Sequence, residues 1–463
     1  MGLGLQLPGV PAGLMALLHA AAAGSRLALV GGAVRDLLLH RVHNDPWRGL
    51  PDLDLVVEGS AADLVQRLQA LLEPSCRLEA ASPWQGAQLV AAQQHGAYGT
   101  VELELEVAAQ AVLLDLASAR RETYPQLGEN PVVSFGSLES DLARRDFTIN
   151  AMALVLDSGQ LLDPHGGQRD LQQRQLRFLH AGSVADDPTR LVRGARYAAR
   201  LGFALAPEAL EQARSTLAAW PWHWRPGDAP GLAPSALGTR LRMELELLLA
   251  REPWPRALGA LQRWGALALL DGQLQADQAW RRRLRWAERL GLPLLLALVA
   301  GAADPLTLAE RLQLPHRQHK LLTQWLELRR RWQQLDGAAA WGPPQWCHWL
   351  EAAGLSPDAV ALELAFARGG GPALLALPPR RPLLRWWARW RHLKAPMGAA
   401  ELMAAEGLRP GPAVGDRLRQ LLIDPQTCGP LLAALPAAQA TAAIPALKQA
   451  GFLHAAVIGR VVD

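Results

Sequence analysis

The residues best suited to chemistry near the start of the chain are two glycines and two aspartates. Gly31 and Gly32 follow the apolar run 27–30, and Asp52 and Asp54 alternate with apolar residues further on. Because side chains two apart on a strand point to the same face, we expect two carboxylates about 7 Å apart. The glycines allow close backbone approach, and a helix predicted to follow them offers unpaired N–H groups to an anion. An anion site beside paired carboxylates suits a nucleoside triphosphate carried on magnesium.

Alternating strand and helix patterns in the N-terminal third would position these residues. Apolar residues recur at helical spacing over 60–72, and strands are predicted over 87–91, 99–107 and 111–117. Asp115 lies in the last strand as a third carboxylate. Alone, such an aspartate is more often a hydrogen-bonding group at the end of a sheet than a ligand. Residues 119–131 contain two prolines and no periodicity, so they are predicted to form a loop.

Strand patterns end near residue 205, and the rest of the chain has helical patterns separated by Pro- and Gly-rich segments. The sequence therefore predicts an α+β fold. It would have a head with a mixed sheet and helices over 1–155, then an all-α neck over 156–245 and an all-α body and tail over 246–463. Half of the residues are hydrophobic and 19% are charged, which excludes a disordered chain. The net charge of +4 is compatible with a nucleic-acid partner without indicating one.

The cysteines and the apolar runs bear on the cell compartment. Cys76, Cys347 and Cys428 lie far apart, which favours a reducing compartment and neither a disulfide framework nor a zinc site. The apolar N-terminus has no basic segment and is interrupted by prolines, so no secretory signal is predicted. The apolar run 290–303 is too short to span a bilayer. We therefore expect a cytoplasmic protein with no membrane partner; its oligomeric state is left open.

Five motifs occur in an order that resembles one known family. They are Gly31-Gly32-Ala-Val-Arg35-Asp36, Asp52-Leu-Asp54, Arg144-Arg145-Asp146-Phe-Thr-Ile-Asn150-Ala, Asp163…Gly166-Gly167…Asp170 and Asp186-Asp187-Pro-Thr-Arg190-Leu-Val-Arg193. A double glycine or an Asp-x-Asp alone arises often by chance. Together, over about 26–205, the five resemble the class II tRNA nucleotidyltransferase/poly(A) polymerase family, which includes the CCA-adding enzymes. Later in the chain the resemblance fades.

The resemblance implies a magnesium-dependent enzyme that adds C and/or A to tRNA 3′ ends without a template. Its nucleotide substrates would be CTP and ATP, and pyrophosphate would be released. Asp52 and Asp54 would bind two Mg²⁺ ions, and Asp115 aligns with the third catalytic carboxylate of the family. Asp36 is expected to brace Arg35 rather than to touch metal. By position, the phosphates would be bound by Gly31, Gly32 and Arg35, and the ribose by Arg145, Asp146 and Asn150.

Asp187 and Arg190 form the predicted base-selecting pair. They lie three apart at a helix start and therefore share a face. Aspartate only accepts hydrogen bonds and arginine only donates them, which matches the Watson–Crick edges of C and A but not those of U and G. The resemblance implies that this pair replaces a nucleic-acid template, and that Arg193 and Arg196 also approach nucleotide or RNA. The sequence departs from the family at Asp186, where a glutamate is usual.

The exact member of the family is open. Residues 121–131 correspond to a flexible loop that the family links with adding the final A, and their near full length disfavours a CC-only enzyme. A dedicated A-adding enzyme and a poly(A) polymerase remain alternatives, although the long basic tail expected of the latter is lacking. A catalytically silent RNA-binding protein would be expected to lose a carboxylate or the pair Asp187 and Arg190. A small-molecule nucleotidyltransferase would need neither that pair nor the helical extension.

Overall fold

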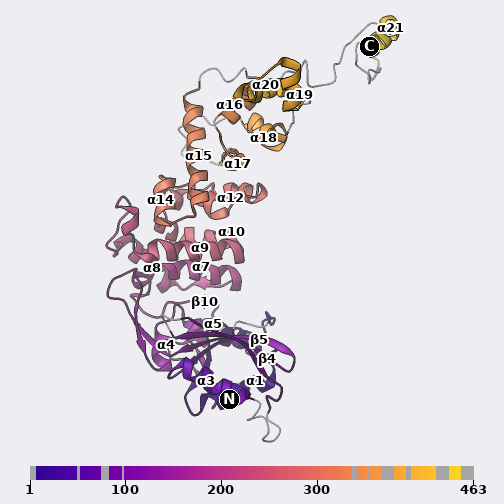
Figure 1. The fold of residues 1–463 in the computed structure, drawn as a ribbon. Coiled ribbons are helices and arrows are strands. Elements are labelled where there is room, and N and C mark those ends of the chain that lie inside the picture. The colour runs from indigo at the N-terminus through magenta and orange to yellow at the C-terminus, as the bar shows by residue number, and fades with distance from the viewer. Residues whose placement is uncertain are drawn as a thin grey trace. The chain divides into compact units, whose positions relative to one another are not determined.

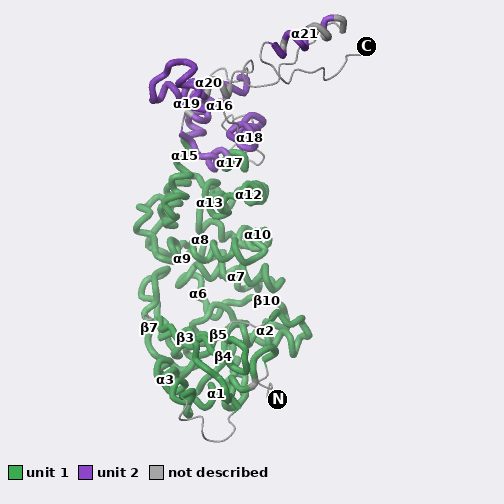
Figure 2. The backbone as a smooth tube through the Cα atoms, turned by 45° about the vertical axis from the view of Figure 1, so that its right-hand side comes forward, with its two compact units in different colours: residues 1–327, 361–375 green, residues 328–360, 376–463 purple. Residues whose placement is uncertain are grey.

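The computed structural model describes residues 7–49, 53–73, 83–95, 99–335, 341–352, 354–366, 380–392, 398–423 and 437–449. The chain divides into two compact units, one made of residues 1–327 and 361–375 and the other of residues 328–360 and 376–463 (Figure 2). The domain borders predicted at residues 155 and 245 stay predictions.

The first unit begins with a seven-stranded mixed sheet in the order β3-β4-β5-β2-β1-β8-β9 (Figure 1). Strands β2 and β5 run parallel, and every other neighbouring pair runs antiparallel. With helices on the sheet and a helical continuation, this confirms the predicted α+β class. The strands are β1 (Leu27–Val30), β2 (Leu53–Val57), β3 (Gln88–His95), β4 (Thr100–Val107), β5 (Gln110–Ser118), β8 (Ala153–Val155) and β9 (Leu161–Leu162).

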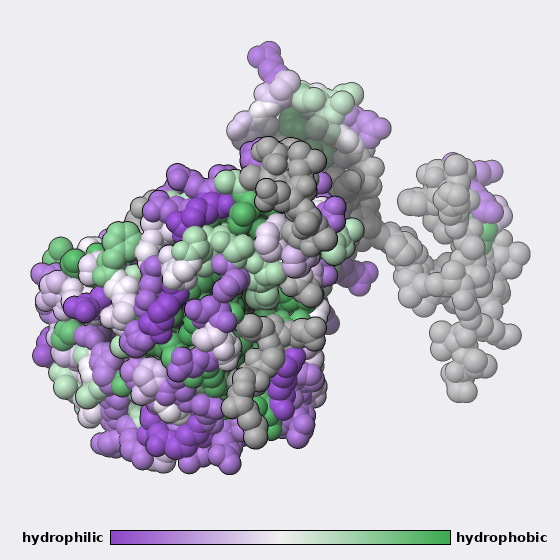
Figure 3. All heavy atoms as spheres, turned by 90° about the horizontal axis from the view of Figure 1, so that it is seen from below, coloured by the Kyte–Doolittle hydropathy of each residue, from purple (hydrophilic) through white to green (hydrophobic). Residues whose placement is uncertain are grey.

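The alternating sequence of β4 and β5 gives the sheet one buried and one open face. In β4, Val101, Leu103 and Leu105 are buried, and the glutamates between them are exposed or half-buried. Helix α3 (Ala61–Leu72) contacts β3, β4 and β5, and α1 (Ala12–Ala22) packs against α3. All the apolar positions predicted for α3 are buried, and the Ser60 side chain caps its N-terminus. The face of the sheet-bearing end seen in Figure 3 mixes hydrophilic and hydrophobic side chains, with hydrophilic ones prevailing along its lower rim.

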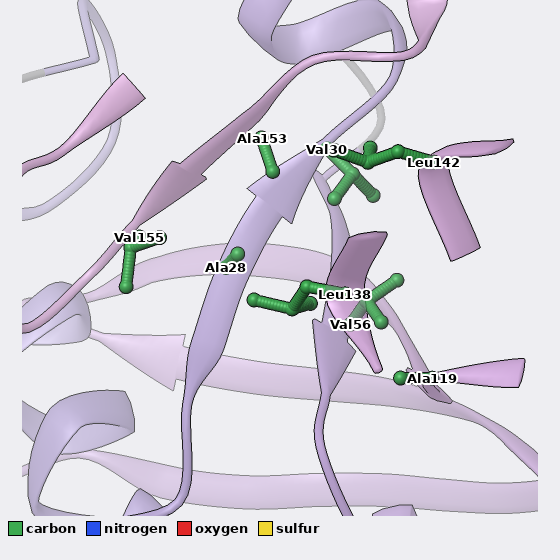
Figure 4. Close-up of a cluster of buried hydrophobic side chains, with 8 residues drawn as sticks. All are labelled: Ala28, Val30, Val56, Ala119, Leu138, Leu142, Ala153 and Val155. Carbon is green, nitrogen blue, oxygen red and sulfur yellow. The ribbon is translucent and has the colours of Figure 1, made fainter. Parts of the chain in front are cut away.

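A cluster of buried apolar side chains joins helix α4 (Leu138–Ala143) to strands of the sheet (Figure 4). Helix α4 contributes Leu138 and Leu142 to this cluster, and both are fully buried. Each buried leucine contributes about 1.5–3 kcal/mol relative to an exposed one. The arginines that follow α4 are therefore carried on a well-anchored element. The cluster consists of Ala28, Val30, Val56, Ala119, Leu138, Leu142, Ala153 and Val155.

The prediction of a loop over 119–131 is wrong for the first part of that segment. Strand β6 (Arg120–Thr123) pairs antiparallel with β7 (Val132–Phe135), and residues 124–131 connect them. The residues of β6 are arginines, a glutamate and a threonine, so backbone hydrogen bonds rather than an apolar alternation mark this strand. The sequence pattern therefore could not reveal it.

The rest of the first unit is helical, as predicted. After β11 (Ala204–Leu205), which pairs with β10 (Gln175–Leu176), the described residues contain no strand beyond a single bridge. Helix α7, which precedes β11, packs together with α9 and α10. The helices are α2 (Gly32–Arg41), α5 (Gly167–Gln172), α6 (Ser183–Asp186), α7 (Thr189–Leu201), α8 (Pro207–Ala219), α9 (Thr239–Arg251), α10 (Trp254–Trp264), α11 (Gly272–Ala276), α12 (Trp280–Arg289), α13 (Leu294–Val299) and α14 (Pro305–Arg311).

Where it is described, the second unit is also helical. The rings of Trp332, Trp346 and Trp349 gather in it, with Arg331 over the ring of Trp349. Among the described residues of the whole chain, we find no helix with the length and apolar character needed to cross a membrane. The helices of this unit are parts of α15 (His316–Gln333) and α17 (Pro357–Phe366), with α16 (Pro343–Ala352), α18 (Arg380–Ala388), α19 (Ala399–Glu406), α20 (Pro412–Ile423) and α21 (Ala437–Gln449).

Candidate active site

A pocket of about 710 Å³ in the first unit brings together most of the residues singled out from the sequence. Side chains from the sheet, the β6–β7 hairpin, the segment after α4, and helices α7 and α9 line it. The polar residues of its lining are Asp54, His95, Thr100, Glu102, Asp115, Arg120, Glu122, Tyr124, Asn130, Arg144, Arg145, Asp146, Asp187, Arg190, Arg193 and Arg240. The lining thus combines a carboxylate-bearing sheet with a wall rich in arginine.

Three carboxylates line the pocket from neighbouring strands. Asp54 of β2 lies opposite Asp115 of β5, and Asp115 lies opposite Glu102 of β4. Directly paired residues on one face have Cβ atoms roughly 5 Å apart, so these carboxylates are neighbours. Glu102 was not predicted as a site residue, although its place in an alternating strand was a usable signal. Asp52 lies outside the described residues, so its predicted spacing from Asp54 stays a prediction.

The turn after β1 requires a glycine at its first position. Gly31 has φ 69° and ψ −131°, and helix α2 begins directly after it, as the sequence predicted. A Cβ on Gly31 would lie 3.2 Å from Arg145 Nη1 and 3.2 Å from Asp54 Oδ2. The backbone here is therefore approached closely by the sheet carboxylate and by an arginine. At Gly32 an added Cβ would make only an ordinary contact.

Arg35 is buried beneath the turn rather than exposed in the pocket. Its Nε donates to Asp36 Oδ1 at 2.8 Å, which is the bracing contact expected of Asp36. Its Nη1 donates to Asn150 Oδ1 at 2.9 Å, and its guanidinium lies over the Tyr197 ring. Neither Arg35 nor Asn150 belongs to the lining of this pocket. The predicted contacts of these two residues with phosphate and ribose stay predictions.

The two arginines after α4 share a carboxylate that the sequence analysis did not single out. Asp141 is fully buried. Its Oδ1 accepts from Nε (2.9 Å) and Nη2 (2.7 Å) of Arg144, and its Oδ2 accepts from Nε (3.3 Å) and Nη2 (2.9 Å) of Arg145. Burial would raise the pKa of Asp141, but the charges of Arg145 and Arg144 outweigh it and hold the pKa below its usual value. The spacing i, i+3 and i+4 was the available signal.

The hairpin is joined to this pair through Glu122. Arg144 Nη1 donates to Glu122 Oε1 at 3.0 Å, and the Tyr124 hydroxyl donates to Glu122 Oε2 at 3.2 Å. Burial and then the charge of Glu122 raise the pKa of Tyr124 to about 12, so its hydroxyl stays protonated at neutral pH. The connection 124–131 is tied to α6, because Gly128 N donates to Asp186 O at 3.0 Å. The Asp186 carboxylate itself faces His180, with 3.9 Å between Oδ2 and Nε2.

Asp187 is a buried carboxylate with four hydrogen bonds. Its Oδ1 accepts from N (3.0 Å) and Oγ1 (2.6 Å) of Thr189, and its Oδ2 accepts from Arg193 Nη2 (3.0 Å) and Arg240 Nη2. Burial would raise the pKa of Asp187, but Arg193 and Arg240 hold it at about 2. Asp187 is therefore ionised at neutral pH and acts as an acceptor only. Arg240 lies on another helix, α9, and was not predicted as a site residue.

Arg190 lies beside Asp187 in the pocket lining but is held by other groups. Its Nη1 donates to Ser183 O at 3.4 Å and its Nη2 to Arg144 O at 3.1 Å. Its buried Nε has no hydrogen-bond partner within the described part of the chain. A buried unpaired donor costs about 1–3 kcal/mol, which a bound acceptor would relieve.

The structure separates the next two arginines of α7. Arg193 lines the pocket and donates from Nε to Asp146 Oδ2 at 2.8 Å. Arg196 is outside the lining, because it pairs with Glu244 at 2.7 Å and with Glu252 at 3.5 Å. Of the three residues predicted to bind the ribose, Arg145 and Asp146 line the pocket.

Asp54 and Asp115 supply the oxygen ligands that Mg²⁺ prefers, so the donor chemistry fits this metal. Among the residues that the structure describes, no group of three or more His, Cys, Asp or Glu side chains is arranged to hold a metal ion. The set predicted to bind metal includes Asp52, which is outside those residues. The assignment of Asp52 and Asp54 as metal ligands therefore stays a prediction.

Comparisons with known proteins agree with this arrangement. A Poly A polymerase head domain matches residues 27–177. The chain is 40% identical over 311 residues to the CC-adding tRNA nucleotidyltransferase of Deinococcus radiodurans, covering 65% of this chain and 71% of that protein. It is 39% identical over 191 residues to the A-adding tRNA nucleotidyltransferase of Aquifex aeolicus, covering 39% of this chain and 19% of that protein. A solved Thermotoga maritima CCA-adding enzyme complexed with tRNA superposes with a TM-score of 0.60 at 21% identity, covering 91% of this chain and 92% of that one. That likeness establishes the fold alone.

Proposed function

The chain belongs to the class II tRNA nucleotidyltransferase family, and we propose that it adds C, A or both to the 3′ ends of tRNA. CTP and ATP would be the nucleotide substrates, and pyrophosphate would be released. One observation carries the proposal: the pocket that holds Asp54 and Asp115 also holds Asp187 and Arg190. Two carboxylates that would suit phosphoryl chemistry and a pair that would read the base therefore line the same pocket.

The reaction would be an attack of the tRNA 3′-hydroxyl on the α-phosphorus. A bond forms between the hydroxyl oxygen and that phosphorus, the bond to the β-phosphate oxygen breaks, and pyrophosphate leaves. Asp52 and Asp54 would hold Mg²⁺, which when bound neutralises phosphate charge and lowers the pKa of the hydroxyl. Asp115, which lies directly opposite Asp54, would accept the hydroxyl proton.

The phosphates would lie at the turn after β1. Gly31 and Gly32 bring the first N–H groups of α2 to this point, where the helix dipole favours an anion. Nη1 of Arg145, which Asp141 does not bind, lies at the same point and adds a positive charge. Asp146, held by Arg193, is the candidate acceptor for a ribose hydroxyl. Arg35 and Asn150 would act from beneath, by supporting the turn.

The base would be read by Asp187 and Arg190. The Arg190 Nε is a buried donor with no partner among the residues that the structure describes, which would suit the ring-nitrogen acceptor of C or A. The acceptor sites of Asp187 are already taken by Thr189, Arg193 and Arg240. Accepting the exocyclic amino group of a base therefore requires Asp187 to give up one of these bonds when the nucleotide binds.

The test is nucleotide addition to defined tRNAs. Transcripts that lack the terminal CCA, that lack only the final A, and that are complete would each receive labelled CTP or ATP in separate reactions with magnesium. Incorporation of neither nucleotide by folded protein would refute the proposal. Product length then separates a CCA end, a single A and a long A tail.

A CC-only activity is the second candidate, because the Deinococcus relative is named for it. The same reactions decide it, since a CC-only enzyme would stop before the final A. The near full length of residues 121–131, which correspond to the family's flexible loop, favours addition of A as well.

A substitution tests the metal-binding assignment separately. Asp52→Ala is expected to abolish incorporation while tRNA binding persists, because chemistry rather than RNA affinity depends on this carboxylate. Glu106→Gln is the matched control: it removes a carboxylate from the exposed end of β4 and should leave incorporation unchanged. Retained activity in Asp52→Ala would remove Asp52 from the catalytic set.

A further inference from the structure

The buried carboxylate of Asp141 determines which edge of Arg145 remains available to a ligand. Both Nε and Nη2 of Arg145 are used by Asp141 Oδ2. The remaining nitrogen, Nη1, is the one that lies 3.2 Å from the Cβ position of Gly31. Since a guanidinium is planar and rigid, two bonds to one edge set the direction of the opposite edge.

The same carboxylate keeps two like charges together. Arg144 and Arg145 are adjacent in the chain, and Asp141 takes two hydrogen bonds from each. Without the shared anion the two guanidiniums would repel one another. Arg145 would then be drawn towards Asp54, whose Oδ2 lies at the same 3.2 Å from the Gly31 Cβ position. An arginine paired with Asp54 would compete with the metal and the triphosphate there.

We propose that Asp141 is a positioning residue, which aims Nη1 of Arg145 at the nucleotide phosphates and keeps Arg145 from pairing with Asp54. This inference rests on the function proposed above. Asp141 itself is fully buried, so it acts through Arg145 and touches no substrate. Arg144 is held by the same carboxylate and donates to Glu122, so Asp141 also fixes the position of the hairpin relative to α4.

The primary test is Asp141→Asn, which keeps the side-chain shape and removes the charge. Single-nucleotide addition should show a higher KM for the nucleotide and a fall in kcat/KM of up to about 100-fold, because a misplacement of about 1 Å costs that much. The matched control is Glu139→Gln on the same helix, whose exposed carboxylate pairs with Arg26 at the surface. It should leave both constants unchanged. An unchanged KM in Asp141→Asn would overturn the proposal.

A double-mutant cycle separates positioning from general stability. If Asp141 acts through Arg145, Asp141→Asn should add little to the defect of Arg145→Ala. Additive defects would contradict the proposal, because they would mean that Asp141 acts independently of Arg145.

If Asp141→Asn does not fold, Arg145→Lys tests the same proposal in a protein that keeps Asp141. Lysine can pair with Asp141 but lacks a second nitrogen to present at the same time, so kcat/KM should fall about as far as in Arg145→Ala. Wild-type kinetics in Arg145→Lys would overturn the proposal. Failure of the wild-type protein to add any nucleotide would instead refute the function on which this inference rests.

Discussion

Replacing Gly31 by alanine tests both the strained turn and the close approach around it. With φ 69° and ψ −131°, the residue occupies a region that side-chain-bearing residues avoid, at a cost of about 1–3 kcal/mol. The added Cβ would also meet Arg145 Nη1 and Asp54 Oδ2 at 3.2 Å, so both must move by a few tenths of an ångström. Arg145 cannot swing away freely, because Asp141 holds two of its nitrogens.

We therefore expect Gly31→Ala to lower the free energy of unfolding by about 1–3 kcal/mol. It should also slow nucleotide addition by about tenfold, a fraction of the loss expected for a 1 Å displacement. Thermal unfolding followed by circular dichroism measures the first effect, and single-nucleotide addition at saturating tRNA measures the second.

Gly32→Ala is the control at the neighbouring position. Its φ is not positive, and the nearest atom to the added Cβ would be Arg35 Nη2 at 3.5 Å. Alanine is favoured over glycine within a helix by up to about 1 kcal/mol, so this variant should be no less stable than wild type. Equal losses in the two variants, or no loss in Gly31→Ala, would refute the reasoning from backbone geometry.

Three further predictions concern charged residues on or beside α7 and α9. The ion pairs hold the pKa of Asp187 at about 2, below its usual value, so they stabilise the fold above about pH 4 and this stabilisation is lost as pH falls towards 2. Acid unfolding should therefore begin at higher pH in Arg240→Ala. Arg190→Ala should loosen the choice of nucleotide more than it weakens triphosphate binding, as competition between the four nucleotides would show. Glu252→Gln removes the charge that pairs with Arg200 and should lower the free energy of unfolding by roughly 1–3 kcal/mol. The loss should be smaller than for a fully buried ion pair, because the Arg200 side chain is 40% exposed. Nucleotide addition should be unchanged in this variant.

The elements that carry strong periodic signals were predictable from the sequence. The short apolar run before Gly31 became β1, and the helical pattern over 60–72 became α3. Strand β6 was missed because its residues are polar. The pairing of Asp54 with Asp115 could not be predicted either, because it depends on β5 entering the sheet beside β2, past two intervening strands.

The ion-pair partners and the burial of the α7 arginines could not be predicted from the sequence pattern either. In isolation, Arg193 and Arg196 have the spacing of a solvated helix face. In the structure they pair with Asp146, Glu244 and Glu252, which lie far away in the chain. No local window contains both members of these pairs, so only the tertiary fold reveals that the arginines are mostly buried.

The parallel pairing of β2 with β5 also has a consequence for the order of folding. Strands β3, β4 and β5 are consecutive and antiparallel, so short turns can bring them together early. Strand β5 must then dock along β2, a non-local contact whose loop-closure cost slows it. In pulse-labelled hydrogen exchange during refolding, we expect the amides that pair β4 with β5 to become protected before those that pair β2 with β5. Asp54 and Asp115 would then become neighbours only in the last step of folding of the head. A partly folded chain that has already paired β4 with β5 would therefore still be inactive.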